Sequence, residues 1–214
     1  MKTFLRFFFR LLYHPFAFTY DLVAATVSFG RWKDWILEVI PFIAGTRVLE
    51  LGHGPGHLQR VLLSRSLPAL DRVVAVGLDE SPQMGRLAKR NTDGSARLTR
   101  GLAQQLPFAS DSFDTIIATF PTEYFADPST LAEVKRCLNN GGRFIVLPAA
   151  MPRNPLLSWL FKFTEQAPTE ALKIVQEKLE KPFLEADFHV ETHVLELRSG
   201  RLIVIVATQN PGHG

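Results

Sequence analysis

The residues best suited to chemistry in this chain are a glutamate and three glycines at every second position. They lie in ELGHGPG (50–56), directly after the apolar stretch RVLEL. Glycine is needed where the backbone turns sharply and comes close to a ligand, because it has no Cβ. Such a turn between a strand and a helix is where open parallel sheets bind nucleotides. The spacing therefore predicts a site for a nucleotide-like cofactor.

Two other kinds of glycine-rich loop are excluded by spacing. A dinucleotide fingerprint that began at Gly52 would need a glycine at position 57, and one that began at Gly54 would need a glycine at 59. Those positions hold His57 and Gln59. A phosphate-binding GxxxxGK[ST] loop is absent as well. We therefore expect a cofactor without a phosphate group.

A metal site is a weak alternative for the same segment. His53 and His57 stand four apart near Glu50, but that spacing brings two side chains together only on a helix, and His53 falls in the glycine turn. We expect no metal ion. The sequence also lacks the G-x-S-x-G elbow of the α/β-hydrolases.

Short apolar runs alternate with helical patterns after Gly45, which is typical of a parallel sheet covered on both faces. After Pro152 the pattern changes to two helical segments and then two strands joined by the turn RSGR, which predicts an antiparallel pair. We expect an α/β fold with one domain over 41–214, preceded by amphipathic and capping helices over 1–40. The expected strands span 47–52, 73–79, 96–101, 113–120, 142–148, 188–197 and 202–209.

Composition limits the function classes. With 214 residues and 46% hydrophobic content the chain can bury one sizeable core. The net charge of +3 is dispersed, so nucleic acid is not an expected partner. A single cysteine excludes an internal disulfide framework and suits the cytoplasm.

The motif order resembles that of the class I S-adenosylmethionine-dependent methyltransferases. Besides ELGHGPG, the matching stretches are VVAVGLDES, GLAQQLPFASDSFDTIIA and LNNGGRFIVL, which together cover about 45–150. The resemblance implies a Rossmann-like, mostly parallel seven-stranded sheet with a C-terminal antiparallel hairpin. It also implies S-adenosyl-L-methionine as cofactor, bound by these residues: Glu50, Gly52, His53, Gly54, Gly56, Asp79, Glu80, Ala103 and Gln104.

Asp79 and Leu102 need separate comment. The acid that matches Asp79 takes the ribose hydroxyls in that family, although Asp79 could also cap the helix that follows it. Where the family usually has an acid for the adenine amine, this chain has Leu102. Adenine recognition would then depend on the backbone of Ala103 and on Gln104.

Catalysis of methyl transfer requires alignment and exclusion of water more than a dedicated base. The segment FPTEY (120–124) matches the acceptor side of the family's pocket. Glu123 or Tyr124 could orient or deprotonate an acceptor, and an exposed structural role for Glu123 is an equal alternative.

The first 18 residues suggest where the acceptor resides. On a helix, Lys2, Arg6 and Arg10 would form one basic stripe, with leucines and phenylalanines facing away from it. This pattern is typical of a helix that lies in a membrane interface, and the alternative is a helix docked on its own domain. The stretch is too interrupted for a spanning helix or a secretory signal.

Two further stretches indicate a lipophilic acceptor. The run from Tyr20-Asp21 through SFGRW (28–32) to Trp35 resembles that of the quinone-biosynthesis methyltransferases and is similar to that of the bacterial phosphatidylethanolamine N-methyltransferases. The apolar segment 156–163 falls where related enzymes have a substrate lid, or else it packs on the sheet. We expect a peripheral membrane methyltransferase that acts on a headgroup amine or a quinone-type ring. A soluble small-molecule methyltransferase and a non-catalytic scaffold are the alternatives.

Overall fold

A computed structural model describes residues 32–64, 70–152 and 168–210 of the chain. The expected amphipathic helix in 1–18, the run from Tyr20 to Arg31 and the apolar segment 156–163 lie outside these ranges. The predicted boundary between 1–40 and 41–214 therefore stays a prediction.

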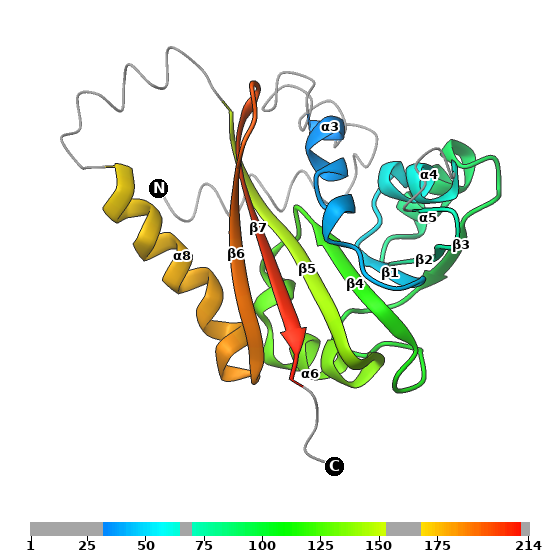
Figure 1. The fold of residues 1–214 in the computed structure, drawn as a ribbon. Helices are drawn as coiled ribbons and strands as arrows, with labels where there is room; N and C mark the ends of the chain where they lie inside the picture. The colour runs from blue at the N-terminus through cyan, green and yellow to red at the C-terminus, as the bar shows by residue number, and fades with distance from the viewer. Residues whose placement is uncertain (1–31, 65–69, 153–167, 211–214) are drawn as a thin grey trace, which may run out of the picture.

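A seven-stranded sheet forms the centre of the molecule, with the strand order β3-β2-β1-β4-β5-β7-β6 (Figure 1). Strands β1 to β5 pair in parallel, and β7 runs antiparallel to both β5 and β6. The predicted mixed sheet with a C-terminal hairpin is confirmed. The strands are β1 Arg47–Leu51, β2 Val74–Asp79, β3 Arg97–Arg100, β4 Phe113–Thr119, β5 Leu138–Pro152, β6 Phe188–Glu196 and β7 Gly200–Gln209.

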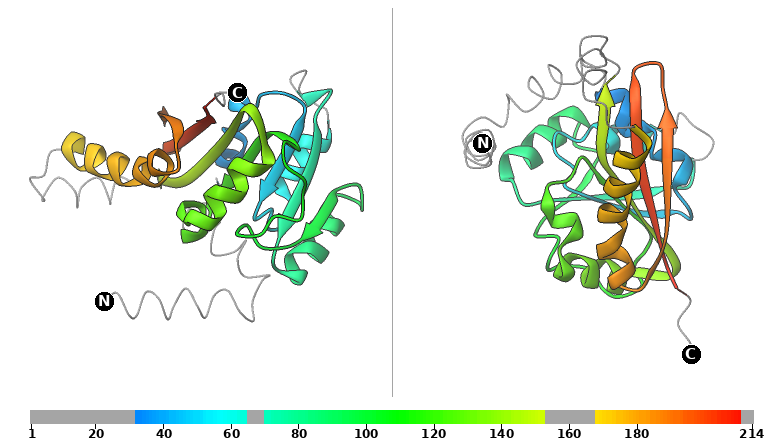
Figure 2. Two further views of the ribbon diagram at one scale, coloured as in Figure 1. Left: turned by 90° about the horizontal axis from the view of Figure 1, so that it is seen from below. Right: turned by 90° about the vertical axis from the view of Figure 1, so that its left-hand side faces the viewer.

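Helices cover the sheet on both faces, as the views in Figure 2 show. The α-helices are α3 Trp32–Leu37, α4 His57–Ser64, α5 Pro82–Asn91, α6 Pro128–Cys137 and α8 Pro168–Glu185, with two 3₁₀ turns, η1 Ile40–Phe42 and η3 Glu123–Ala126. None of the helices within the described ranges is long and apolar enough to cross a membrane.

Two apolar clusters divide between the two faces of the sheet. Val48 packs with α3 and α4, whereas Leu49 and Leu51 pack with α6 and α8. This alternation follows from the two-residue period of a strand. It places Glu50 on the same face as Val48, toward α4. The indole of Trp35 in α3 also donates a hydrogen bond to Ser199 Oγ at 2.9 Å.

One helix start and the bounds of several strands differ from the expectation. Ser81, not Asp79, is the N-cap of α5, because the Ser81 hydroxyl accepts a hydrogen bond from Met84 N. Strand β5 begins already at Leu138, opposite Phe113, and regular pairing resumes at Arg143. The chain bulges between these two points, where Gly141 has a φ of 73°.

Candidate functional site

The glycine turn lies at the carboxyl end of β1, where the sheet order reverses between β1 and β4. Ligands bind at such a point in open α/β sheets. Gly52, Gly54 and Gly56 have φ values of 69°, 50° and 82°, a region that favours glycine. The turn is tied to β2, because Gly52 N donates to Leu78 O at 2.7 Å.

The three glycines have different surroundings. A Cβ on Gly52 would lie 2.6 Å from Tyr124 Oη, and one on Gly56 would lie 2.8 Å from Ala88 Cβ. Both positions are therefore closed by protein. A Cβ on Gly54 would meet nothing within 4 Å. The side of the turn at Gly54 is open, and a ligand can approach the backbone there.

Asp79 ends β2 beside this opening. Its Oδ2 accepts a hydrogen bond from Gly54 N at 2.9 Å, and its Oδ1 accepts one from Ser81 N at 2.8 Å. A carboxylate oxygen can accept two hydrogen bonds, so each oxygen keeps one acceptor position. Asp79 thus holds the glycine turn and can still accept a hydrogen bond from each of two hydroxyl groups of a ligand.

Glu50 is buried behind the turn, with 2% of its surface exposed. Its Oε2 accepts a hydrogen bond from Gln59 Nε2 at 2.8 Å. Burial raises the pKa of Glu50 to about 8, a rise that Gln59 opposes and the negative charge of Asp79 reinforces. A cation beside this carboxyl would lower its pKa again and favour loss of the proton.

His53 has a packing role. It is 4% exposed, its Nδ1 lies 2.8 Å from Gly54 O, and its ring packs against Gly77 of β2. His57 points elsewhere, with its ring edge-on to Trp32 at 4.9 Å. Among the residues that the structure describes, no group of three His, Cys, Asp or Glu side chains could hold a metal ion.

The turn after β3 lies beside Asp79, since Gly101 N donates to Asp79 O at 3.2 Å. Leu102 is 51% exposed and Gln104 is exposed, whereas Ala103 belongs to the core. Glu80 is exposed as well, and its carbonyl accepts from Arg100 Nε at 3.0 Å. The fold thus gathers the residues predicted to bind the adenosine around one edge, and their individual roles stay predictions.

Tyr124 and Glu123 differ in position. Tyr124 Oη lies 3.1 Å from Leu51 O, to which it donates, so the hydroxyl touches the glycine turn from η3. Glu123 is exposed and its carboxylate makes no hydrogen bond or ion pair with another described residue. Tyr124 is therefore placed to hold the turn, and neither residue's catalytic role is tested.

Gln59 is the site residue that sequence reasoning missed. In the sequence it stands out only as the residue that breaks a dinucleotide fingerprint. The signal that could have identified it is its position, nine residues after Glu50 and two after the start of α4. A helix that follows the glycine turn must run back over β1, so its first residues lie close to that strand.

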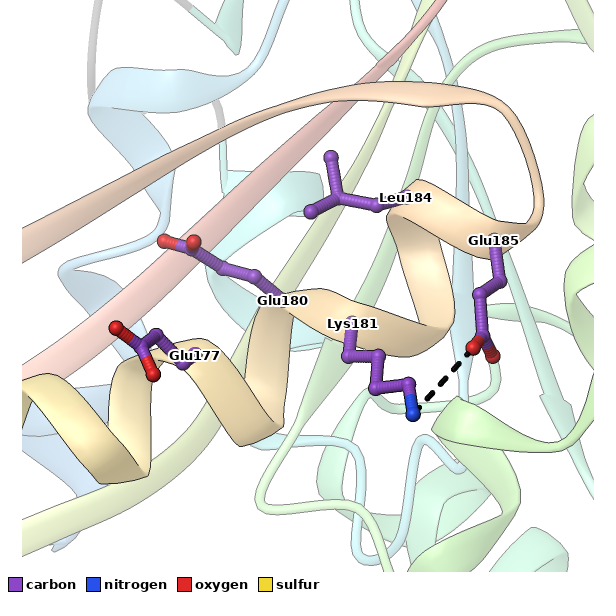
Figure 3. A pocket seen from close by; sticks show the side chains of 5 residues that line it. All are labelled: Glu177, Glu180, Lys181, Leu184 and Glu185. Atoms are coloured by element: carbon purple, nitrogen blue, oxygen red, sulfur yellow. Dashed lines mark ion pairs between the residues drawn. The ribbon is translucent and has the colours of Figure 1, made fainter.

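A shallow hollow lies far from this site, along α8. Figure 3 shows its lining, which comes from one helix: Glu177, Glu180, Lys181, Leu184 and Glu185. Lys181 Nζ pairs with Glu185 Oε1 at 3.6 Å. Because α8 packs on the face opposite to α4, this hollow is not part of the glycine-turn site.

Comparisons with known proteins agree with this geometry. Residues 49–146 match a family model described as a methyltransferase domain. The chain is 30% identical, over 94% of its own length and 92% of the other, to a demethylmenaquinone methyltransferase of Symbiobacterium thermophilum. It is also 30% identical, over 72% of its length, to a ubiquinone/menaquinone biosynthesis C-methyltransferase of Geobacter sulfurreducens, and there the match spans only 62% of the relative.

Solved structures share the fold. The chain superimposes with a TM-score of 0.62 on an S-adenosylmethionine-dependent methyltransferase from Thermotoga maritima, at 20% identity, covering 93% of this chain and all of the other. At that identity the likeness concerns the fold alone.

The donor set fits the family's cofactor. S-adenosylmethionine has ribose hydroxyls that can donate hydrogen bonds to Asp79. It also has an ammonium group that can form an ion pair with the buried carboxyl of Glu50. The open side of Gly54 leaves room for it, and the buried Gln59 amide steadies Glu50. Similarity over nearly the whole length of a relative, the fold shared with solved methyltransferases and this donor set lead to one conclusion: the chain belongs to the class I S-adenosylmethionine-dependent methyltransferases.

Proposed function

We propose that this chain methylates a quinone-type ring at a membrane surface. The observation that carries the proposal is the similarity, over 92% of the relative's length, to a protein named demethylmenaquinone methyltransferase. A second relative is named for ubiquinone and menaquinone biosynthesis. A phospholipid headgroup amine is the other acceptor that the sequence suggests.

Residues of this chain would bind and orient rather than react. S-adenosylmethionine supplies a methyl group on a sulfonium, so the donor is already activated. Asp79 would hold the ribose, Glu50 the ammonium group, and Tyr124 would keep the glycine turn in place. Placing donor and acceptor in line and excluding water can account for several kcal/mol of the barrier, on the order of 7 or more in the best cases.

A methyl-transfer assay with labelled cofactor tests the acceptor. The arms are a demethylated quinone in vesicles, phosphatidylethanolamine vesicles, and vesicles of phosphatidylcholine alone. We expect label only in the quinone. Label in phosphatidylethanolamine alone would replace the proposed acceptor, and no label in any arm would contradict the proposal.

Membrane attachment through 1–18 is a separate part of the proposal. The support is the basic stripe of Lys2, Arg6 and Arg10 on an otherwise apolar stretch. In co-sedimentation with anionic vesicles, the variant with all three changed to Glu should lose binding, because each basic residue near the surface contributes about 1 kcal/mol. A matched control changes three exposed basic residues elsewhere, Arg60, Arg86 and Lys89, to Glu. Equal sedimentation of both variants with the unmodified chain would show that this stretch does not attach the protein.

A scaffold that has kept the fold without catalysis is the second candidate. The observation in its favour is Leu102, which is half exposed where the family usually places an acid for the adenine amine. Calorimetric titration with S-adenosylhomocysteine separates the two candidates, because a scaffold that has lost the site should bind nothing.

A further inference from the structure

Gln59 is a buried amide that makes one short hydrogen bond with the described residues, to the carboxyl of Glu50. Its side chain is fully buried, with Nε2 at 2.8 Å from Glu50 Oε2 and at 3.5 Å from Val76 O. Its amide oxygen, also buried, has no hydrogen-bond partner among the described residues. Burying an amide costs free energy that only its hydrogen bonds offset. The bond to Glu50 is therefore the main interaction that this side chain provides.

The orientation of the Gln59 amide follows from its neighbours. Val76 O is a carbonyl that can only accept, so the Gln59 nitrogen, and not its oxygen, must face it. The same nitrogen then lies beside Glu50 Oε2, which accepts from it. A donor aimed at a carboxyl group favours its charged form. Gln59 therefore counteracts the burial that favours the neutral form of Glu50.

Among the residues that the structure describes, no lysine or arginine forms an ion pair with Glu50. The imidazole of His53 packs on Gly77, which is the residue of β2 paired with Glu50. From β2 the nearby charge is Asp79, which is negative, and from β4 the paired residue is Ile117, which is uncharged. From α4 the group that faces it is Gln59. Glu50 forms no ion pair with any described residue, although an ionised buried carboxylate needs a positive partner. A ligand cation would meet that need.

We propose that Gln59 is a positioning residue that holds the Glu50 carboxylate toward the ammonium group of the cofactor, so that cofactor binding at neutral pH releases a proton from Glu50. The proton leaves to solvent, and the carboxylate and the ammonium remain as an ion pair. The inference rests on binding of S-adenosylmethionine and is independent of the methyl acceptor.

Two ligands separate this role from general support of the fold. S-adenosylhomocysteine carries the ammonium group, whereas 5′-methylthioadenosine has the same adenosine and thioether but lacks the amino-acid portion that bears the ammonium and the carboxylate. Because the pKa of Glu50 in the unliganded protein is about 8, most of this carboxyl is protonated at pH 7. Calorimetry in buffers of different ionisation enthalpy should show release of about one proton with S-adenosylhomocysteine and none with 5′-methylthioadenosine.

The test variant is Gln59→Met, which keeps the volume and removes the donor. At pH 7 it should bind S-adenosylhomocysteine about tenfold more weakly or worse, and bind 5′-methylthioadenosine as the unmodified protein does. The pH at which proton release ceases should move upward, because the Glu50 carboxyl has lost the donor that favours its charged form.

The control is Thr115→Val, which removes a buried hydroxyl that bonds Ala44 at the opposite end of the sheet. It should leave both affinities and the pH profile unchanged. If Gln59→Met weakens the binding of both ligands equally, or leaves the pH dependence of proton release unchanged, Gln59 only supports the fold. Absence of proton release in the unmodified protein, or of any binding, would also overturn the inference. Failure of the quinone assay alone would leave all these binding results intact.

Discussion

At the scale of single residues, Glu50 has surroundings that strongly disfavour its charged form. Among the residues described, it is the only buried acid, and it lies directly behind the glycine turn. The same burial that prepares it for a cation is unfavourable when no ligand is present, because an ionised carboxyl loses its hydration. The site therefore trades stability of the empty protein for attraction of the cofactor.

This trade predicts a pH dependence of stability. Burial raises the pKa of Glu50 from 4.5 to about 8, so the folded state holds a proton that the unfolded state has released. This proton adds to the free energy of unfolding. The addition is fully present below pH 4.5 and is lost as pH rises through 8, at up to about 1.4 kcal/mol per pH unit. In denaturant titrations without ligand, Glu50→Gln should remove this decline and be more stable than the unmodified protein at pH 8.5. The hypothesis fails if the two proteins lose stability in parallel over this range.

Asp79 gives a second prediction for a single residue. Asp79→Asn keeps one acceptor oxygen but removes the charge and replaces the other acceptor by an NH₂ donor that faces a backbone N–H. We expect S-adenosylhomocysteine to bind at least tenfold more weakly, on the order of 1.5 kcal/mol or more, as measured by calorimetry. Glu80→Gln, one residue further along and exposed, is the matched control and should cause a smaller loss. Equal losses in the two variants would argue against Asp79 as the ribose ligand.

At the scale of elements, Asp114 joins β1, β4 and β5. It lies near the amino-terminal ends of these parallel strands, opposite to the site at their carboxyl ends. Its carboxylate accepts hydrogen bonds from Thr46 N, Arg47 N and the Arg47 guanidinium, and also from Asn139 Nδ2. The adjacent Gly45 has a φ of 70°, and a Cβ there would clash with the Asp114 side chain. One side chain thus sets how the chain enters β1.

Removal of this carboxylate should destabilise the fold without changing the site. We expect Asp114→Ala to lower the free energy of unfolding by about 2 kcal/mol, because charged hydrogen bonds to the backbone are lost. Partial burial raises the pKa of Asp114, but the hydrogen bonds from Arg47 and Thr46 outweigh it and hold this pKa below 3.8. The stabilisation is present above pH 3.8 and is lost as the pH falls further, so the variant should be less sensitive to acid. Asp71→Ala, at an exposed turn, should change stability by about 0.5 kcal/mol or less.

At the scale of the whole molecule, the site is built from segments that are distant in sequence. Residues of β1, β2, α4 and η3 meet at one edge, and Tyr124 reaches the carbonyl of Leu51 from 73 positions away. A ligand that touches several of these elements should stabilise the folded chain as a unit.

Cofactor binding should therefore raise the unfolding temperature. At a concentration one hundred times its dissociation constant, S-adenosylhomocysteine should add about 2.7 kcal/mol, as measured by thermal unfolding of the full chain. S-inosylhomocysteine, which replaces the adenine amine by a carbonyl, is the matched ligand. Because Leu102 offers no acceptor to that amine and Gln104 is exposed, we expect the two ligands to stabilise the protein to a similar extent. A strong preference for the adenine form would show that another acceptor replaces the acid.

The sequence alone determined the fold family, the seven strands and the glycine turn, because periods of two and 3.6 residues and obligatory glycines are local properties. Local signals also located Asp79 at the end of β2. They left open a second role for it as N-cap of α5, where Ser81 is the residue that caps. Only the tertiary structure decided what each polar group meets. It buried His53 against Gly77, turned Tyr124 onto the glycine turn, and brought Gln59 onto Glu50. Side-chain partners and pKa values depend on contacts between elements, and periodicity within one element carries no information about them.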